Sequence, residues 1–188
     1  MSGTPYNTKA YANLCVYSPG KSKANQSQFP SHQSRVSCAL VTAAVLKEHT
    51  LKFHKKSKDG SGKCNAYYTG SKQDEVIGVV FDIHCKEKPN LDGAEGICRG
   101  YHEKRIYLES ADGIIEAFMY EADSWAIDDF MRPYTWYKDF VVQGAREHGL
   151  PEDYIRQIEA VPADQDLDES RDEANRRMIS AHGGWPIK

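Results

Sequence analysis

The fold is decided by Leu91-Asp92-Gly93-Ala94-Glu95-Gly96 and the segments on either side of it. Residues 74–83, which precede it, are two acids followed by an apolar, β-branched run, and this pattern predicts a buried strand. Residues 101–108 and 114–120, which follow it, are each expected to form a strand. Between them, Ala111-Asp112-Gly113 is a turn signal typical of a hairpin.

Glu95 is therefore expected on a short connection between strands, beside a glycine that lets another backbone or a ligand approach closely. A lone carboxylate in such a place is a candidate general base. Spacing alone equally allows a helix-capping acid or a solvated loop acid. The residues by themselves leave both interpretations open.

The composition is that of a soluble globular protein of one domain, with 188 residues, 40% hydrophobic and 27% charged. A net charge of -3 argues against a nucleic-acid partner, because a phosphate footprint needs clustered Lys and Arg. The stretch from Lys47 to Lys63 is locally basic. We interpret it as a solvated strand and loop in preference to a phosphate-binding patch.

The cysteines and histidines predict no structural metal. The five cysteines include no CxxC pair, and the seven histidines have no ligand spacing. There is no apolar signal core and no apolar run long enough for a membrane span. We therefore expect a cytoplasmic protein in a reducing compartment, without a membrane or nucleic-acid partner.

The remaining chain contributes strands first and helices last, which indicates the α+β class. The expected strands are residues 11–17, 38–46 and 50–55, the last two being either separate or one bent strand, and a short one at 65–69; the expected helices are 135–149 and 151–160. Residues 162–188 form a polar tail, either a terminal helix or a partly ordered arm.

Four segments, in this order, resemble the gamma-glutamylcyclotransferase family: residues 74–80, 91–96, 133–137 and 144–151. The resemblance extends over about residues 41–161, and residues 53–63 fit bacterial-type members well.

The resemblance implies a small mixed, partly closed β-barrel with flanking helices. This single domain would cover residues 1–161, with a divergent segment at 1–37, and the tail would follow it.

The chemistry implied by the resemblance is an intramolecular acyl transfer. The α-amine of a γ-glutamyl compound attacks its own δ-carbonyl, which gives 5-oxoproline and releases an amine or amino acid. The acid of the family's Leu-Asp-x-x-Glu-Gly motif falls on Glu95, which would act as general acid and base. The reaction needs neither metal nor cofactor, and the expected partner is a small γ-glutamyl molecule bound by a monomer or homodimer.

Tyr120 and Tyr137 fall where the family keeps tyrosines that line the substrate pocket, and Tyr101 lies near the same mouth. A tyrosine in these elements can also serve ordinary core packing, so both roles remain open for all three. Crowding by such rings would raise the pKa of Glu95 toward the working range.

The family's first strand ends in a Tyr-Gly-Ser-Asn or Tyr-Gly-Ala-Asn loop that cradles the γ-glutamyl head, and no such tetrapeptide is intact in this sequence. Ala12-Asn13 is one partial match. Lys23, Ala24 and Asn25 form another, at the better distance from the apolar strand that follows, and we predict that they bind the substrate.

Because the family's glycine is missing, a second function remains open, a catalytically inactive relative that binds a small ligand or a protein. A third is an enzyme acting on a different γ-glutamyl substrate.

Overall fold

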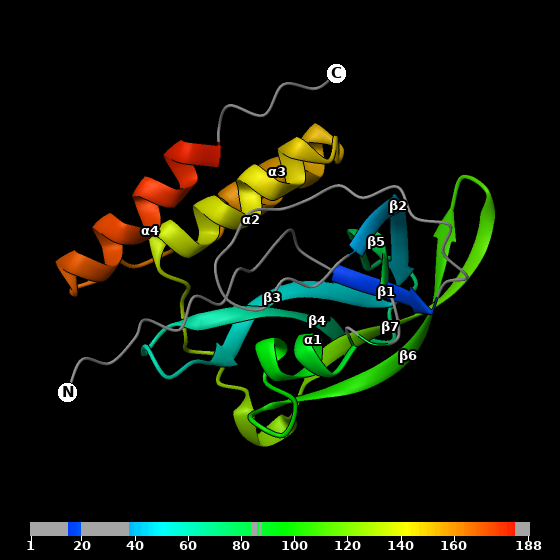
Figure 1. Cartoon of the computed structure of the whole chain (residues 1–188), viewed down its shortest axis with the longest axis horizontal. Helices are drawn as coiled ribbons and strands as arrows, with labels where there is room; N and C mark the ends of the chain where they lie inside the picture. Colours follow the sequence, from blue (N-terminus) through cyan, green and yellow to red (C-terminus); the bar gives the residue numbers. More distant parts are fainter. Residues whose placement is uncertain (1–14, 20–37, 84–85, 87, 183–188) are drawn as a thin grey trace.

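The structure, a computed structural model, describes residues 15–19, 38–83, 86 and 88–182 (Figure 1). Its strands are β1 (Cys15–Pro19), β2 (Cys38–Lys47), β3 (His49–Lys56), β4 (Gly62–Tyr68), β5 (Glu75–Ile83), β6 (Tyr101–Ser110) and β7 (Gly113–Ala122). Its helices are α1 (Lys88–Glu95), α2 (Thr135–Glu147), α3 (Glu152–Glu159), α4 (Glu169–His182) and the short 3-10 helix η1 (Ser124–Ala126).

Five strands form a closed barrel in the order β1-β5-β2-β6-β7. β1 runs parallel to β5, and the other neighbouring pairs are antiparallel. Two seams are narrow, because β1 meets β7 through Tyr17 opposite Phe118, and β2 meets β6 through Val45 opposite Glu109. The prediction of a small mixed α+β barrel with flanking helices is therefore confirmed.

β3 and β4 form a separate antiparallel pair that packs against β5 and β7. The chain reverses between β2 and β3 at Glu48, whose φ is 62°. The backbone of Glu48 is held there, because its N–H donates to Asp74 and its carbonyl accepts from Thr69. Of the two arrangements predicted for this region, two separate strands is the correct one.

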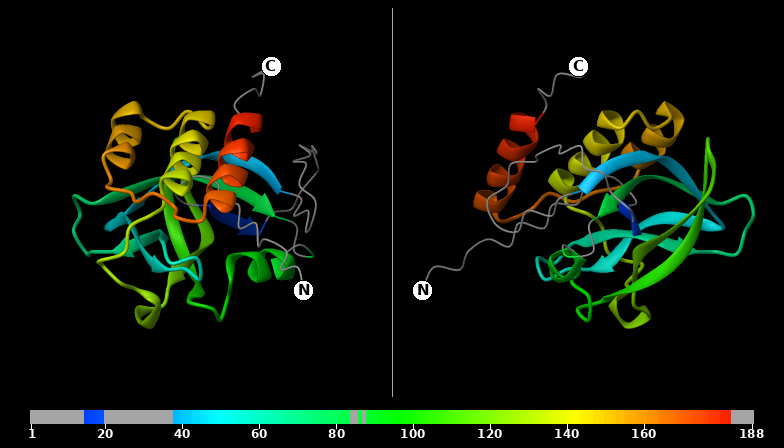
Figure 2. Two further views of the ribbon diagram at one scale, coloured as in Figure 1. Left: turned by 90° about the vertical axis from the view of Figure 1, so that its left-hand side faces the viewer. Right: turned by 45° about the vertical axis from the view of Figure 1, so that its right-hand side comes forward.

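Helices α2, α3 and α4 gather on one side of the strands, and α1 lies on the other (Figure 2). α2 begins shortly after Pro133, and Gly149, with a φ of 65°, follows its end, as the sequence predicts. Trp136, Val141 and Ala145 point inward at helical spacing and are buried. The larger of two apolar cores therefore lies between the barrel and these helices.

The connection that follows β5 differs from the prediction. Residues 91–96 were expected to be a short link between strands, but most of them belong to α1. Leu91 anchors the helix in the core, and Lys88 pairs with Asp92 one turn later. Gly96, with a φ of 80°, ends the helix, since glycine takes the left-handed conformation without strain. Glu95 is therefore the last helical residue.

The polar tail contains α4, which packs against α2. The segment before α4 is fixed by Asp166, whose side chain is fully buried. Asp166 accepts hydrogen bonds from Trp136 Nε1 at 2.9 Å and from two nitrogens of Arg171 at 2.6 Å each. In the ranges that the structure describes, no helix is both long and apolar enough to cross a membrane.

Candidate active site

Glu95 lies at the end of α1 with its side chain partly buried. Desolvation by the surrounding protein raises the pKa of its carboxyl from 4.5 to about 7. No described residue forms an ion pair or hydrogen bond with this carboxyl. The result is an acid that changes protonation state near neutral pH.

Tyr101 and Tyr120 are the predicted site residues that lie near Glu95. The charge of Glu95 contributes, after burial and closer groups, to raising the pKa of both phenols. Tyr101 is opposite Ala122, and Glu103 is opposite Tyr120, so these four residues share one face of the β6–β7 ribbon. The structure thus brings three of the predicted residues together around one end of α1.

Tyr120 joins β7 to α1. Its hydroxyl donates a 2.6 Å hydrogen bond to Asp92 Oδ1, and Lys88 pairs with both Asp92 and Glu103. α1 is therefore held against the ribbon from two points, and its last residue, Glu95, is held with it. The burial of Tyr120 and its bond to Asp92 are the main reasons why its pKa is raised.

Tyr101 and Tyr137 meet at the backbone of Cys64 on β4. The Tyr101 hydroxyl donates to the Cys64 carbonyl at 2.8 Å, and the Cys64 N–H donates to the Tyr137 hydroxyl at 3.2 Å. Tyr137 is a buried core residue, with its ring edge-on to Phe53 and Trp136. It is connected to Tyr101 through Cys64.

Two lysines of the basic stretch are part of this region, which the sequence did not predict. The Lys63 side chain is only 13% exposed; its Nζ lies 2.7 Å from Asp59 Oδ2 and 4.3 Å from the centre of the Tyr137 ring. Lys55 Nζ lies 4.6 Å from the centre of the Tyr101 ring. The interpretation of this stretch as solvated is therefore wrong for Lys63, because Asp59 and the aromatic rings compensate its burial.

Lys23, Ala24 and Asn25 lie outside the described residues, as does the alternative, Ala12-Asn13. The first strand, β1, ends at Pro19, a few residues before Lys23. Proline is tolerated there because a strand end needs no further ladder donor.

Within the described ranges, no cluster of three or more His, Cys, Asp or Glu side chains could hold a metal ion.

The sequence model of the AIG2-like family matches residues 75–158, the part of the chain that runs from β5 to α3 and includes Glu95. No curated protein sequence matches the chain.

Solved structures resemble the chain more widely. A gamma-glutamyl cyclotransferase is 24% identical with a TM-score of 0.68, covering 77% of this chain and 86% of its own. An uncharacterized protein from Homo sapiens is 24% identical with a TM-score of 0.65, covering 76% and 85%. YkqA from Bacillus subtilis is 17% identical with a TM-score of 0.52, covering 66% of this chain and 46% of its own. At these identities the likenesses establish the fold.

Proposed function

We propose that the chain catalyses intramolecular acyl transfer on a γ-glutamyl compound, because the AIG2-like family model matches residues 75–158 and the fold is like that of a gamma-glutamyl cyclotransferase. The α-amine forms a bond to the δ-carbonyl carbon, and the bond from that carbon to the leaving nitrogen breaks. The products are 5-oxoproline and a free amine or amino acid. The narrower prediction of a bacterial-type member stays a prediction.

The observation that carries the proposal is the state of Glu95. With a pKa of about 7, its carboxyl is partly ionised at neutral pH and can both take and return a proton. In the proposed reaction, Glu95 removes a proton from the α-ammonium and later passes it to the leaving nitrogen. An ordinary solvated acid would stay ionised and be a poorer donor in the second step.

One carboxylate suffices because the nucleophile is tethered to the electrophile. The protein mainly has to hold the substrate chain folded, with the reacting atoms about 3 Å apart. The hydroxyls of Tyr101 and Tyr120 already donate to Cys64 and Asp92, so we propose that their rings form walls of the site. No metal or cofactor takes part in the proposed reaction.

Donors for the developing oxyanion would come from the backbone, as the family resemblance implies. That Lys23, Ala24 and Asn25 supply these donors remains a prediction, as do the monomeric or homodimeric state and the cytoplasmic location.

The test is to incubate the purified protein with a panel of γ-glutamyl amino acids and γ-glutamyl amines and to detect 5-oxoproline by mass spectrometry. We expect 5-oxoproline and the free amine in equal amounts from at least one compound. If no compound is cyclised, the proposal is wrong.

The second candidate, a non-catalytic binding module, is favoured by one observation, the missing Tyr-Gly-Ser-Asn tetrapeptide. It predicts that calorimetry detects binding of a panel compound that the protein never cyclises.

A further inference from the structure

Lys55 carries an ammonium group that the proposed chemistry does not use. It lies near the end of β3, partly buried, with Nζ over the face of the Tyr101 ring. Burial, and then repulsion by the nearby charge of Lys63, lower the pKa of Lys55. A charge in such a place is unfavourable unless an anion compensates it.

Every other partly buried lysine in the described ranges has an oxygen partner. These partners are Asp129 for Lys52, Asp59 for Lys63, Asp92 and Glu103 for Lys88, Glu121 for Lys104, and the carbonyls of Glu159 and Val161 for Lys138. Lys55 has no carboxylate or carbonyl partner among the described residues. Among these partly buried lysines, Lys55 is therefore the one whose ammonium group is available to an anionic group of a ligand.

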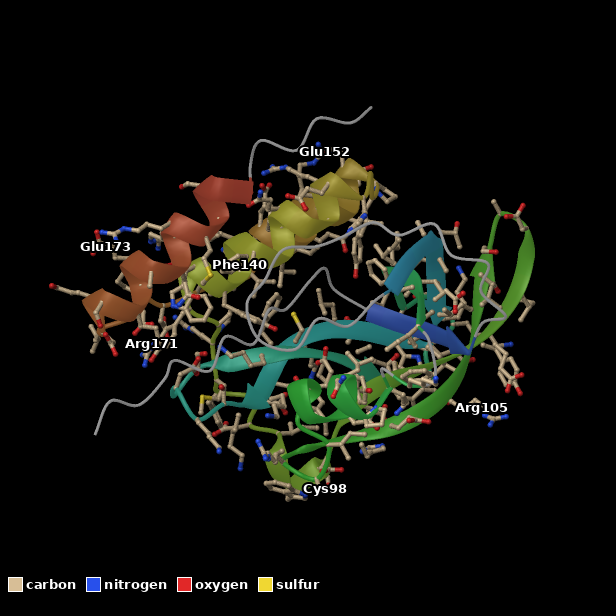
Figure 3. The ribbon with its side chains drawn as sticks, in the orientation of Figure 1. Cys98, Arg105, Phe140, Glu152, Arg171 and Glu173 are labelled. Carbon is tan, nitrogen blue, oxygen red and sulfur yellow. The ribbon has the colours of Figure 1, made fainter. Side chains whose placement is uncertain are left out.

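The position of Lys55 is built into the fold. β3 forms a bridge to Ile127 at Lys55, which fixes its backbone. Gly100, with a φ of 109°, leaves room for its side chain, since a Cβ there would lie 3.0 Å from Lys55 Cε and 2.9 Å from Ala126 Cβ. Cys98, labelled in Figure 3, belongs to the same turn before β6.

Lys55 and Glu95 are both neighbours of Tyr101. The ammonium of Lys55 lies over its ring, while the charge of Glu95 acts on its phenol. The charges that act most on Lys55 come from Lys63, Asp59, Asp123 and Lys58, and Glu95 is not among them. If the α-amine of a substrate faces Glu95 on α1, another part of the same substrate could reach Lys55 on β3, on the far side of the Tyr101 ring.

We propose that Lys55 is a specificity-determining residue that binds an anionic group on the leaving amine. The proposal rests on the proposed function and assigns the residue that distinguishes a negatively charged leaving amine from a neutral one. The α-amine of the γ-glutamyl head would face Glu95, and the leaving amine would lie on the side of the Tyr101 ring that carries Lys55. Lys55 takes no part in making or breaking bonds.

The experiment compares γ-glutamyl-alanine with γ-glutamyl-ethylamide, which differ only by the carboxylate of the leaving amine. In Lys55→Met, kcat/KM for γ-glutamyl-alanine should fall about 10-fold to 100-fold, mainly through KM, because a hydrogen bond to a charged group is lost. The value for γ-glutamyl-ethylamide should not change. Lys55→Arg should keep the preference, and Lys56→Met, which removes an exposed charge next to it, should alter neither value.

Binding measured by calorimetry separates this proposal from the proposed function. Glu95→Gln should bind γ-glutamyl-alanine more tightly than γ-glutamyl-ethylamide, and Glu95→Gln combined with Lys55→Met should lose that difference. This affinity ratio tests Lys55 even if the wild type cyclises neither compound.

Three results would overturn the proposal. Equal losses on both compounds would assign Lys55 to the γ-glutamyl head. An unchanged preference in a folded Lys55→Met, or no binding of either compound to Glu95→Gln, would leave Lys55 without a role in recognition.

Discussion

The end of α1 and the junction of α2 with α4 each contain a carboxylate removed from solvent, and their surroundings are opposite. Asp166 at the junction is fully buried and accepts hydrogen bonds from Trp136, Arg171 and the backbone N–H of Asp168. Burial alone would raise the pKa of Asp166, but the bonds from Arg171 and Trp136 outweigh it and lower the pKa. Glu95 has burial without such bonds, and its pKa is raised.

The two carboxylates differ in whether hydrogen-bond donors satisfy their oxygens. A buried carboxylate with every oxygen bonded stays ionised and holds two elements together. A buried carboxylate without donors from the protein has a raised pKa, and its oxygens are left to accept a proton or hydrogen bonds from a substrate. Asp166 thus has the bonds of a structural acid, whereas Glu95 has the surroundings that the proposed function needs.

The largest expected effect is on turnover at Glu95. Glu95→Gln keeps the side-chain size but removes the base, so cyclisation should fall about 10²-fold to 10⁴-fold. Thermal unfolding should show a folded protein. Glu116→Gln, which removes an exposed acid from β7, is the matched control and should keep its activity. Near wild-type turnover in Glu95→Gln would show that Glu95 is not the base, and the functional contrast with Asp166 would be wrong.

The converse change is Asp166→Ala. It leaves Trp136 Nε1 and Arg171 without their partner, so the free energy of unfolding should fall by about 1.5–3 kcal/mol, as for hydrogen bonds to charged groups. kcat/KM should stay close to the wild-type value in the folded protein. Chemical denaturation checks the first result, with Asp164→Ala, in an exposed pair with Arg132, as control. A stability like that of the control would contradict the structural role.

The pH dependence of stability should have opposite signs at the two sites. Because the folded pKa of Glu95 is raised from 4.5 to about 7, folding favours its protonated form. That stabilisation is complete below the unfolded pKa and is lost as pH rises through about 7. Wild type should therefore lose thermal stability relative to Glu95→Gln between about pH 5 and about pH 8.

For Asp166 the folded pKa is lowered, so its stabilisation is present at neutral pH and is lost as the pH falls through the folded pKa. Unfolding midpoints of wild type and Asp166→Asn should converge in acid. Parallel curves for wild type and either variant across the pH range would contradict the corresponding pKa shift.

The smallest expected effect is that of metal removal. If proton transfer by Glu95 carries the reaction, dialysis against a chelator should leave the rate of cyclisation unchanged. If turnover is lost on dialysis and restored by a divalent ion, proton transfer by Glu95 alone does not account for the reaction.

Much of the fold could be predicted because its signals are local. α2 has apolar residues at helical spacing between Pro133 and Gly149, and α3 has them after Pro151. β5 is a continuous apolar run. α1 was missed because only Leu91 gives it an apolar anchor and Gly93 interrupts it. Pro89 in its first turn and Gly96 after its end were the signals that could have found it.

A motif indicated Glu95 as a candidate, and its role stays a proposal, whereas contacts between residues far apart in sequence gave no signal. Lys63 is buried through Asp59 nearby and through Tyr137 on another element. A lysine in a strand beside a loop ordinarily indicates solvent, so neither Lys63 nor Lys55 could be assigned from the sequence. The resemblance indicated Tyr120 as a pocket residue, with Tyr101 near the same mouth, and both roles stay predictions. The β6–β7 register puts both residues on the face that carries α1.

That Glu95 is the last residue of α1 has a consequence for how a substrate would be received. The free carbonyls of a helix carry a partial negative charge at its C-terminal end, equivalent to roughly half an elementary charge. In the proposed reaction, this end would attract the positively charged α-ammonium of an incoming γ-glutamyl compound. Once that group had given up its proton, the same partial charge would oppose renewed ionisation of the carboxyl and keep the proton available for the departing nitrogen. The polarity of one eight-residue helix would therefore favour both the arrival of the cation and the retention of its proton.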